Sequence, residues 1–193
     1  MHLNFGCGNR PIKEEGWVNV DKFDNVEADQ VVDLFKMPYP WADNSVDSIL
    51  ASHFIEHIPH SLVPHNMDTF PWTDPAQLRL LQMDGFFAFF EEVGRILKPG
   101  GYIEIECPFG WTNGAFQDPT HTRYIVLQTF GYLHQEPEDD KPFNYNLRYD
   151  FSVSDLQIEL IQSPLIQKDT VDTQMAHTLN VVRNIKLKLT VNK

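Results

Sequence analysis

A short apolar segment that runs into a glycine turn opens the chain and constrains its fold more than any other feature. Leu3-Asn4-Phe5 is followed directly by Gly6-Cys7-Gly8. Glycine lacks a Cβ and lets the backbone approach a ligand closely, and turns of this kind at the end of a parallel strand hold nucleotide-type cofactors. A plain tight turn uses the same residues, so the choice between the two depends on the patterns further along the chain.

Further strand patterns come after the turn, and two of them end on a carboxylate, Asp21 and Asp33. A helical pattern covers residues 76–97, where Asp74 and Pro75 supply an N-cap and a proline at the first helical position. A helix between hydrophobic strands is a βαβ unit, which predicts an α/β fold with a mostly parallel sheet. The expected strands are residues 1–6, 17–21, 29–33, 46–52, 101–107, 151–161 and 183–192.

The first connections between these strands are too short for ordinary crossover helices. Ten residues separate Gly6 from Trp17 and seven separate Asp21 from Asp29, whereas a parallel crossover usually takes about a dozen or more. We therefore expect trimmed N-terminal helices, replaced by loops or single turns, and a thinly covered sheet face. A loop or a partner subunit would cover that face, which leaves a homodimer possible.

Length, charge and cysteine content narrow the class of protein. The 193 residues suit a single domain spanning 1–193, with loop insertions near 59–75 and 108–150. A net charge of −12 repels phosphate backbones, so we expect no nucleic-acid partner. No apolar run reaches the roughly 20 residues of a membrane helix, and no leader pattern is seen. Cys7 and Cys107 stand at strand ends rather than in a disulfide scaffold, so we expect a cytoplasmic protein.

Several short motifs in a fixed order make the chain resemble a known family. They are Leu3-Asn4-Phe5-Gly6-Cys7-Gly8-Asn9, Asn19-Val20-Asp21, Asp33-Leu34 with Pro38, Asp43-Asn44-Ser45-Val46-Asp47, Glu56-His57-Ile58 and Leu97-Lys98-Pro99-Gly100-Gly101. Over about residues 1–107 they resemble the class I S-adenosylmethionine-dependent methyltransferases, in particular the small type 11 methyltransferase-like branch. The resemblance implies a Rossmann-like sheet of about seven strands with an antiparallel C-terminal strand, and S-adenosylmethionine as cofactor.

The resemblance also implies which residues contact the cofactor. Asp21 would accept hydrogen bonds from the ribose hydroxyls, as an ionised carboxylate can. Asp33 would accept from the adenine amine, Leu34 would pack on the adenine ring, and His53 would lie beside the methionine part. The full expected set is Asn4, Gly6, Cys7, Gly8, Asp21, Asp33, Leu34 and His53.

Two departures from the family pattern concern the glycine turn. Asn4 stands where the family often has an acidic residue, and Arg10 stands where a third glycine is expected. Asn4 lacks the charge that would attract the ammonium or sulfonium group of the cofactor, so a lower affinity is expected. A degenerate methyltransferase-like protein that binds cofactor without catalysis therefore stays open as an alternative.

The segment Asp118-Pro119-Thr120-His121 supplies the candidate catalytic residues. His121 would act as a general base, and Asp118 would orient it or contact hydroxyls of the substrate. Asp118 and Pro119 would equally start a helix as N-cap and first residue. The aromatic-rich loops with Asp, His and Arg suit a small polar molecule or a sugar as methyl acceptor.

Two other enzyme classes match parts of the sequence. His53, Glu56 and His57 form the H-x-x-E-H pattern of a zinc hydrolase, which requires a helix under both histidines. The strand pattern before His53 and Pro59 just after His57 leave almost no length for that helix, so we expect no metal. A dinucleotide oxidoreductase is disfavoured because the G-x-G-x-x-G spacing fails at Pro11.

Overall fold

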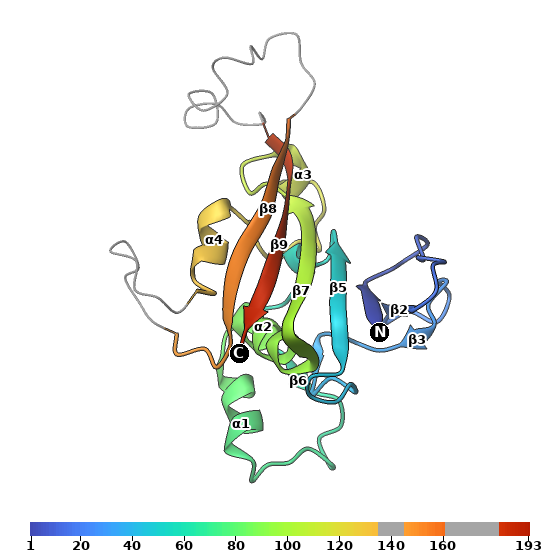
Figure 1. Cartoon of the computed structure of the whole chain (residues 1–193), viewed down its shortest axis with the longest axis vertical. Helices are drawn as coiled ribbons and strands as arrows, with labels where there is room; N and C mark the ends of the chain where they lie inside the picture. The colour runs from blue at the N-terminus through green and yellow to red at the C-terminus, as the bar shows by residue number, and fades with distance from the viewer. Residues whose placement is uncertain (135–144, 161–181) are drawn as a thin grey trace.

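A seven-stranded sheet forms the centre of the computed structural model, which describes residues 1–134, 145–160 and 182–193 (Figure 1). The strand order is β3-β2-β1-β5-β7-β9-β8. The first five strands in this order pair in parallel, and the last strand of the chain, β9, is antiparallel to both of its neighbours. The predicted fold class is confirmed. The strands are β1 (His2–Phe5), β2 (Trp17–Asp21), β3 (Gln30–Val31), β5 (Val46–Ser52), β7 (Leu97–Pro108), β8 (Asp150–Leu160) and β9 (Val182–Asn192).

The predicted helix over residues 76–97 is wrong as a single element, because two helices occupy this stretch. The side chain of Asp74 caps the first helix, as predicted, by accepting from the Ala76 N–H at 2.9 Å. The second helix begins after Asp84, whose carboxylate accepts from the Phe86 N–H at 2.9 Å. The helices are α1 (Pro75–Gln82), α2 (Gly85–Ile96), α3 (Asn113–Phe116), α4 (Leu127–Gly131) and the 3₁₀ turn η1 (Ile55–His57); β4 (Lys36–Met37) and β6 (Val63–Pro64) form a small parallel pair.

Close packing of the chain explains the break between α1 and α2. The Gly85 N–H donates to the carbonyl of His60 at 2.6 Å. A Cβ at position 85 would lie only 2.0 Å from the carbonyl oxygen of Pro59. The chain therefore needs glycine at this contact, and the start of α2 is fixed against residues 59–60.

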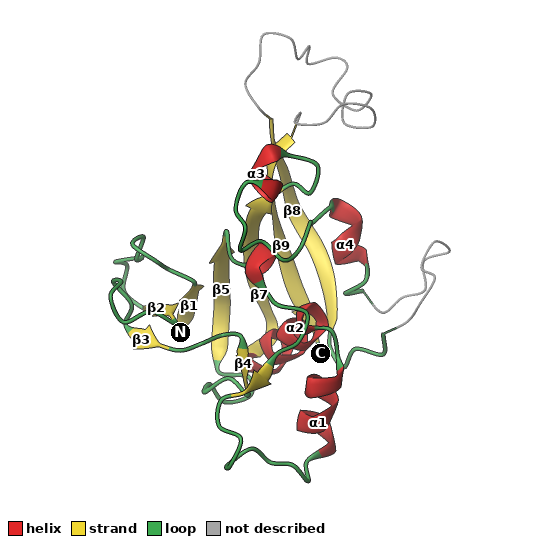
Figure 2. Cartoon of the chain, turned by 180° about the vertical axis from the view of Figure 1, so that it is seen from behind, coloured by secondary structure: helices red, strands yellow, loops and turns green. Residues whose placement is uncertain are grey.

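The hydrophobic core lies between the sheet and the helices, which are on one face of the sheet (Figure 2). Phe86, Phe89, Phe90 and Val93 of α2 are all at most 4% exposed. They pack with alternate residues of the central strands, which point to the same side. These strand residues are Leu3, Phe5, Ile49, Ala51, Ile103, Ile105, Leu187 and Leu189.

The opposite face of the sheet carries mainly polar side chains, and no helix of the described residues covers it (Figures 1 and 2). Lys186 of β9 lies 3.9 Å from Glu106 of β7, and the Lys188 ammonium lies 4.1 Å from the centroid of the Tyr102 ring. Parallel sheets are usually covered on both faces. Here paired charges on the strands make the uncovered face compatible with water.

Near the N-terminus a loop covers this face, as one of the two expected arrangements. The Asn19 side chain donates to the carbonyl of Ile12 at 2.9 Å and accepts from the Ile12 N–H at 2.7 Å. Asn4 donates to Asn19 Oδ1 at 3.0 Å and to the Arg10 carbonyl at 3.3 Å. No helix forms in residues 7–16 or 22–29, so the trimmed N-terminal helices are confirmed. Within the described ranges, no helix has the length and apolar character needed to cross a membrane.

Candidate cofactor and acceptor site

Two cavities that share Gly6 and His53 lie at the carboxyl ends of β1, β2, β3 and β5. The first has a volume of about 380 Å³ and is lined by Gly6, Asp21, Lys22, Phe23, Val32, Asp33, Leu34, Phe35, His53, Phe54, His57 and Thr120. The second has a volume of about 730 Å³ and is lined by Asn4, Gly6, Cys7, Gly8, Asn9, Arg10, Leu50, Ser52 and His53. The structure thus places each of the eight predicted cofactor residues on one of two adjoining cavities.

The glycine turn after β1 has the backbone conformation that glycine permits. Gly6 and Gly8 have φ values of +64° and +50°. A Cβ at position 6 would lie 2.7 Å from Cδ2 of Phe54, whereas a Cβ at position 8 would meet nothing within 4 Å. Gly6, which lines both cavities, is therefore needed for the close contact with the Phe54 ring, and Gly8 serves the conformation of the turn.

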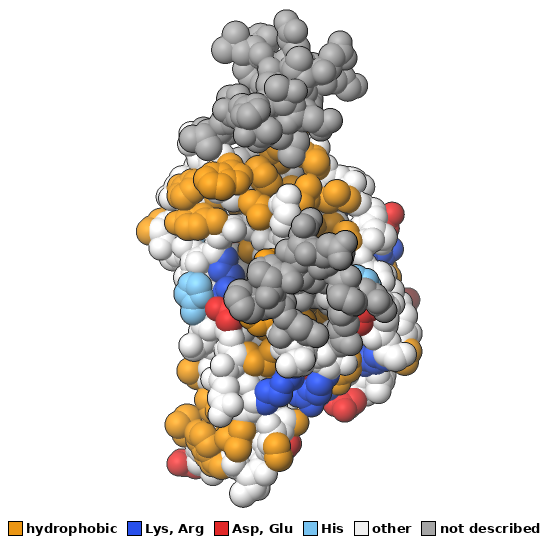
Figure 3. All heavy atoms as spheres, turned by 90° about the vertical axis from the view of Figure 1, so that its left-hand side faces the viewer, with side chains coloured by type: hydrophobic (Ala, Val, Ile, Leu, Met, Phe, Trp, Pro, Cys, Tyr) orange, Lys and Arg blue, Asp and Glu red, His pale blue; other side chains and the backbone are white. Residues whose placement is uncertain are grey.

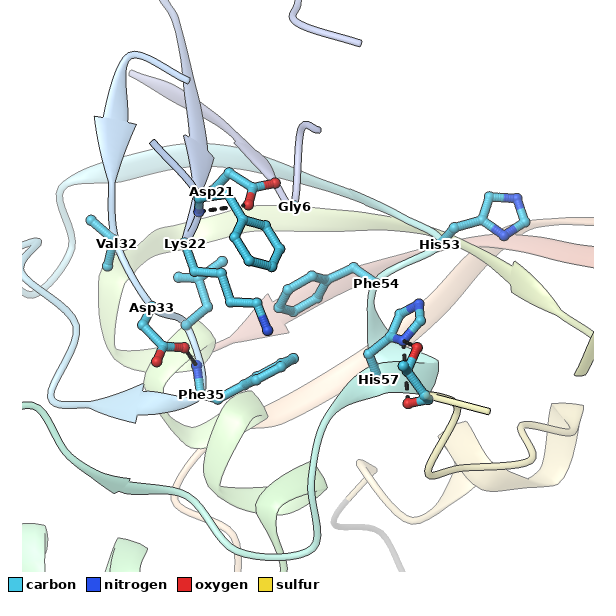
Figure 4. Close-up of a pocket in the computed structure, with 12 residues that line it drawn as sticks. Gly6, Asp21, Lys22, Val32, Asp33, Phe35, His53, Phe54 and His57 are labelled. Atoms are coloured by element: carbon cyan, nitrogen blue, oxygen red, sulfur yellow. Dashed lines mark hydrogen bonds between the residues drawn. The ribbon is translucent and has the colours of Figure 1, made fainter. Parts of the chain in front are cut away.

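Asp21, at the end of the neighbouring strand β2, holds the glycine turn through a hydrogen bond from the turn's backbone. One carboxylate oxygen accepts from the Gly8 N–H at 2.9 Å, and the other accepts from the Phe23 N–H at 3.1 Å. An ionised carboxylate has about four acceptor positions, so it keeps capacity for further donors. The carboxylate lies at the cavity wall, between the turn and β3 (Figure 4).

The side chains of Asp33, Lys22, Phe35 and Phe54 also line the first cavity (Figure 4). Asp33 accepts from the Phe35 N–H at 3.1 Å. The rings of Phe35 and Phe54 are stacked with their centroids 5.6 Å apart, and the Lys22 ammonium lies 5.1 Å from the Phe35 centroid. The sequence interpretation missed Lys22, Phe35 and Phe54, although each of them directly follows a predicted site residue in the chain.

Asn4 and Cys7 have structural contacts in addition to their place at the second cavity. Asn4 is 5% exposed, and its amide nitrogen donates to Asn19 and to the Arg10 carbonyl. Cys7 is also buried, and burial followed by the charge of Asp21 raises the pKa of its thiol. Asn4 therefore holds the loop that covers the sheet. The guanidinium group of Arg10 is a positively charged group that lines the second cavity.

His53 is at the point where both cavities meet. Its φ is +52°, and its N–H donates to the carbonyl of Glu106 at 2.7 Å. Its Nδ1 lies 3.4 Å from Oε1 of Glu56, an ion-pair distance without the geometry of a hydrogen bond. The Glu56 carboxylate is the main cause that raises the pKa of His53, while partial burial opposes the shift.

In the segment around His121, Asp118 neither starts a helix nor holds the ring of His121 by a hydrogen bond. No helix begins at Asp118; its carboxylate instead accepts from the Thr120 N–H at 2.8 Å and the Thr120 hydroxyl at 2.7 Å, which lowers its pKa. The helix-start interpretation is therefore wrong. The Nδ1 atom of His121 lies 2.9 Å from the Ala115 carbonyl, whereas its Nε2 lies 3.9 Å from Asp118. The Ala115 carbonyl, rather than Asp118, orients the ring of His121.

The helix required for a zinc hydrolase does not form at the H-x-x-E-H pattern. Only the three-residue 3₁₀ turn η1 covers Ile55–His57, and His53 precedes it in a left-handed conformation. The ring of His57 instead meets that of His121, with centroids 4.7 Å apart and the planes at 75°. His53 and His57 therefore do not share one face of a helix.

Comparisons with known proteins identify the fold. No family model matches the chain, and no curated protein matches it. A SAM-dependent methyltransferase from Archaeoglobus fulgidus aligns over 98% of this chain and 85% of its own, with a TM-score of 0.57 and 18% identity. The N-methyltransferase NodS from Bradyrhizobium japonicum aligns over 100% and 85%, with a TM-score of 0.53 and 8% identity. A possible histamine N-methyltransferase from Thermotoga maritima aligns over 100% and 82%, with a TM-score of 0.52 and 13% identity.

The strand order and these likenesses agree. The chain has the fold of the class I S-adenosylmethionine-dependent methyltransferases. At these identities the likeness establishes the fold, and the activity must be argued from the residues of the site.

Proposed function

We propose that this protein is an S-adenosylmethionine-dependent methyltransferase that acts on a small polar or sugar-type acceptor. One observation carries the proposal: the eight residues expected to hold the cofactor all border two adjoining cavities at the carboxyl ends of the parallel strands. In open α/β sheets, this end of the sheet is where ligands bind.

The residues present fit the cofactor in shape and in chemistry. The first cavity offers the carboxylates of Asp21 and Asp33 for the ribose and the adenine amine, with Leu34 and the Phe35 ring as apolar walls. The second cavity offers the glycine turn and the guanidinium of Arg10, which would pair with the carboxylate of the methionine part. When bound, S-adenosylmethionine supplies an electrophilic methyl group, so the protein has to position the acceptor and manage its proton.

The acceptor would lie on the side of the first cavity where His57 and Thr120 line it. His121 packs against His57, and its Nδ1 is engaged by the Ala115 carbonyl, which leaves the Nε2 lone pair to take a proton. We propose His121 as the general base for a hydroxyl acceptor. Asp118, 44% exposed at its side chain, would accept from a second hydroxyl of the acceptor. The net charge of −12 favours a small molecule over a nucleic acid.

The cellular setting is inferred from the cysteines, and the assembly from the surface. Cys7 and Cys107 are free and buried, which fits a cytoplasmic enzyme. Apolar side chains gather at the end of the molecule where α3 and the ends of β8 and β9 lie (Figure 3); Trp111, which precedes α3, and Phe116, its last residue, are exposed. Such a surface would serve a homodimer, which light scattering measures.

Titration calorimetry with S-adenosylhomocysteine tests the proposed cofactor site. In Asp21→Asn the side chain keeps its size and one acceptor oxygen but loses its charge. We expect at least about a tenfold loss of affinity, because a hydrogen bond to a charged group contributes about 1.5–3 kcal/mol. Asp24→Asn is the matched control, since Asp24 is exposed nearby in the chain and does not line either cavity.

Three outcomes separate the alternatives. Binding that Asp21→Asn weakens and Asp24→Asn preserves supports the site. Binding without methyl transfer to any of a panel of hydroxyl and amine acceptors supports the degenerate cofactor-binding protein. No binding by the folded wild-type protein, or equal affinity in both variants, refutes the assignment.

A further inference from the structure

Glu56 is a buried carboxylate that the proposed reaction does not use. It is 1% exposed, and neither of its carboxylate oxygens has a hydrogen-bond partner among the described residues. The basic side chain within ion-pair distance among the described residues is His53, whose Nδ1 is 3.4 Å from Oε1. Buried charges in proteins are normally paired and hydrogen-bonded or bound to a metal, because desolvation without partners costs several kcal/mol.

Two histidines converge on this carboxylate. One ligand atom from each of Glu56, His57 and His121 lies within 4.8 Å of the other two. The Nδ1 of His121 is 2.9 Å from the Ala115 carbonyl, and the Nδ1 of His57 is 3.0 Å from the Thr120 hydroxyl and 3.3 Å from the Thr120 carbonyl. A ring nitrogen that donates to a carbonyl fixes the tautomer and leaves the other nitrogen as a metal ligand.

Hydrogen bonds hold the two halves of this cluster together although more than 60 residues separate them. The Thr122 N–H donates to the Glu56 carbonyl at 2.9 Å, and the Thr122 hydroxyl donates to the Ile58 carbonyl at 2.7 Å. Arg123 donates to the same Ile58 carbonyl at 2.7 Å and pairs with Asp84 at 2.8 Å. The backbone of both segments is therefore fixed before any ligand arrives, as a metal site requires.

We propose that Glu56, His57 and His121 bind a divalent transition-metal cation of the zinc class. Two imidazoles and one carboxylate suit zinc, iron, cobalt or nickel, whereas magnesium and calcium prefer oxygen ligands alone. Three protein ligands leave a coordination position open, as in catalytic zinc sites. This set shares Glu56 and His57 with the H-x-x-E-H pattern but takes its third ligand from His121 instead of His53.

The site lies beside the proposed cofactor cavity, because His57 also lines that cavity (Figure 4). An oxygen of the acceptor would occupy the open position. The Nε2 lone pair of His121 would then be a ligand of the cation. The cation would lower the pKa of the acceptor hydroxyl, whose proton would pass to solvent water as the oxygen takes the methyl group, in place of direct proton uptake by His121. Only this role in methyl transfer rests on the proposed function; cation binding does not.

Equilibrium dialysis against Zn²⁺ tests the site. The full chain, without an affinity tag and stripped with a chelator, is dialysed in parallel with Glu56→Gln, His57→Gln and His60→Gln, and bound zinc is measured by mass spectrometry. The expected result is about one equivalent in the wild type and a loss of at least about tenfold in affinity in the first two variants. His60→Gln is the matched control and should bind as the wild type does, because the His60 side chain is 73% exposed and pairs only with Asp84 in the described structure.

The same samples are titrated with S-adenosylhomocysteine, which separates the two proposals. Zinc binding that Glu56→Gln and His57→Gln abolish supports the site whether or not S-adenosylhomocysteine binds. A folded wild type that binds no zinc, or zinc that the His57→Gln variant retains in full, overturns the site. Circular dichroism of each variant establishes that a loss is not unfolding, and His57→Gln stands in if the buried Glu56→Gln does not fold.

Discussion

Replacing Gly6 and Gly8 separately by alanine measures what each glycine of the turn does. Both residues have positive φ, so alanine costs about 1–2 kcal/mol of stability at either position. At position 8 nothing else is expected, because the new Cβ has open space within 4 Å. At position 6 the new Cβ would lie 2.7 Å from the Phe54 ring.

The Phe54 ring cannot move aside cheaply. Its centroid lies 5.6 Å from that of Phe35, 5.8 Å from Phe89 and 6.3 Å from Phe5, so a shift disturbs three further rings. Overpacking of this kind typically costs about 1–3 kcal/mol. We therefore expect Gly6→Ala to lose about 2–5 kcal/mol in total, against about 1–2 kcal/mol for Gly8→Ala.

Urea unfolding of both variants gives the two free energies, and calorimetry with S-adenosylhomocysteine gives the effect on the site. Gly6→Ala should also lose at least about tenfold in affinity, because a displaced Phe54 ring enters the first cavity. Equal destabilisation by the two substitutions would refute the contact with Phe54. Unchanged affinity in Gly6→Ala would refute its place between the cavities.

Three further predictions concern stability and reactivity. Glu92 is 1% exposed and accepts two hydrogen bonds from Arg95, at 2.9 and 2.8 Å. Because Glu92→Gln removes the charge that pairs with Arg95, it should lower the free energy of unfolding in urea by about 3 kcal/mol. A loss below about 1 kcal/mol would contradict a structural role for this ion pair. Lys98 donates to Asp47 at 2.6 Å and is the main cause that lowers the Asp47 pKa from 3.8 to about 2. The stability that this pair adds is therefore present above pH 3.8 and is lost as the pH falls through about 2, so the difference in urea midpoint between wild type and Asp47→Asn should shrink over that window; a constant difference argues against the pair. Because burial raises the pKa of both cysteine thiols, a thiol reagent should label them only after unfolding, and rapid labelling of the native protein would show that one is accessible.

The strands, and the meeting of the expected cofactor residues at one edge of the sheet, were predictable because their signals are local. Residues Gly6 to Gly8, Asp21 and Asp33 each stand directly at the end of an apolar run, and parallel strands bring such ends to one edge of the sheet. The polar face of the sheet is explained by alternation along β7 and β9 in the same way. Local pattern and tertiary structure agree at these positions.

The features that the sequence did not reveal depend on contacts between distant segments. The hydrophobic spacing continues from α1 into α2, and the break arises where Gly85 meets Pro59. Asp84-Gly85, a capping residue before glycine, was the available signal. The proximity of His121 to Glu56 and His57 has no local signal, because the segment that carries His121 reaches them only through the hydrogen bonds of residues 122 and 123.

A crystal structure of the protein with S-adenosylhomocysteine would show whether the cofactor binds at the ends of the parallel strands. We expect the adenosine part in the first cavity, with the ribose hydroxyls on Asp21 and the adenine amine on Asp33. The amino-acid part should lie beyond Gly6, beside Arg10. Density for the ligand elsewhere on the chain, or an adenosine part that contacts neither carboxylate, would contradict the cofactor site.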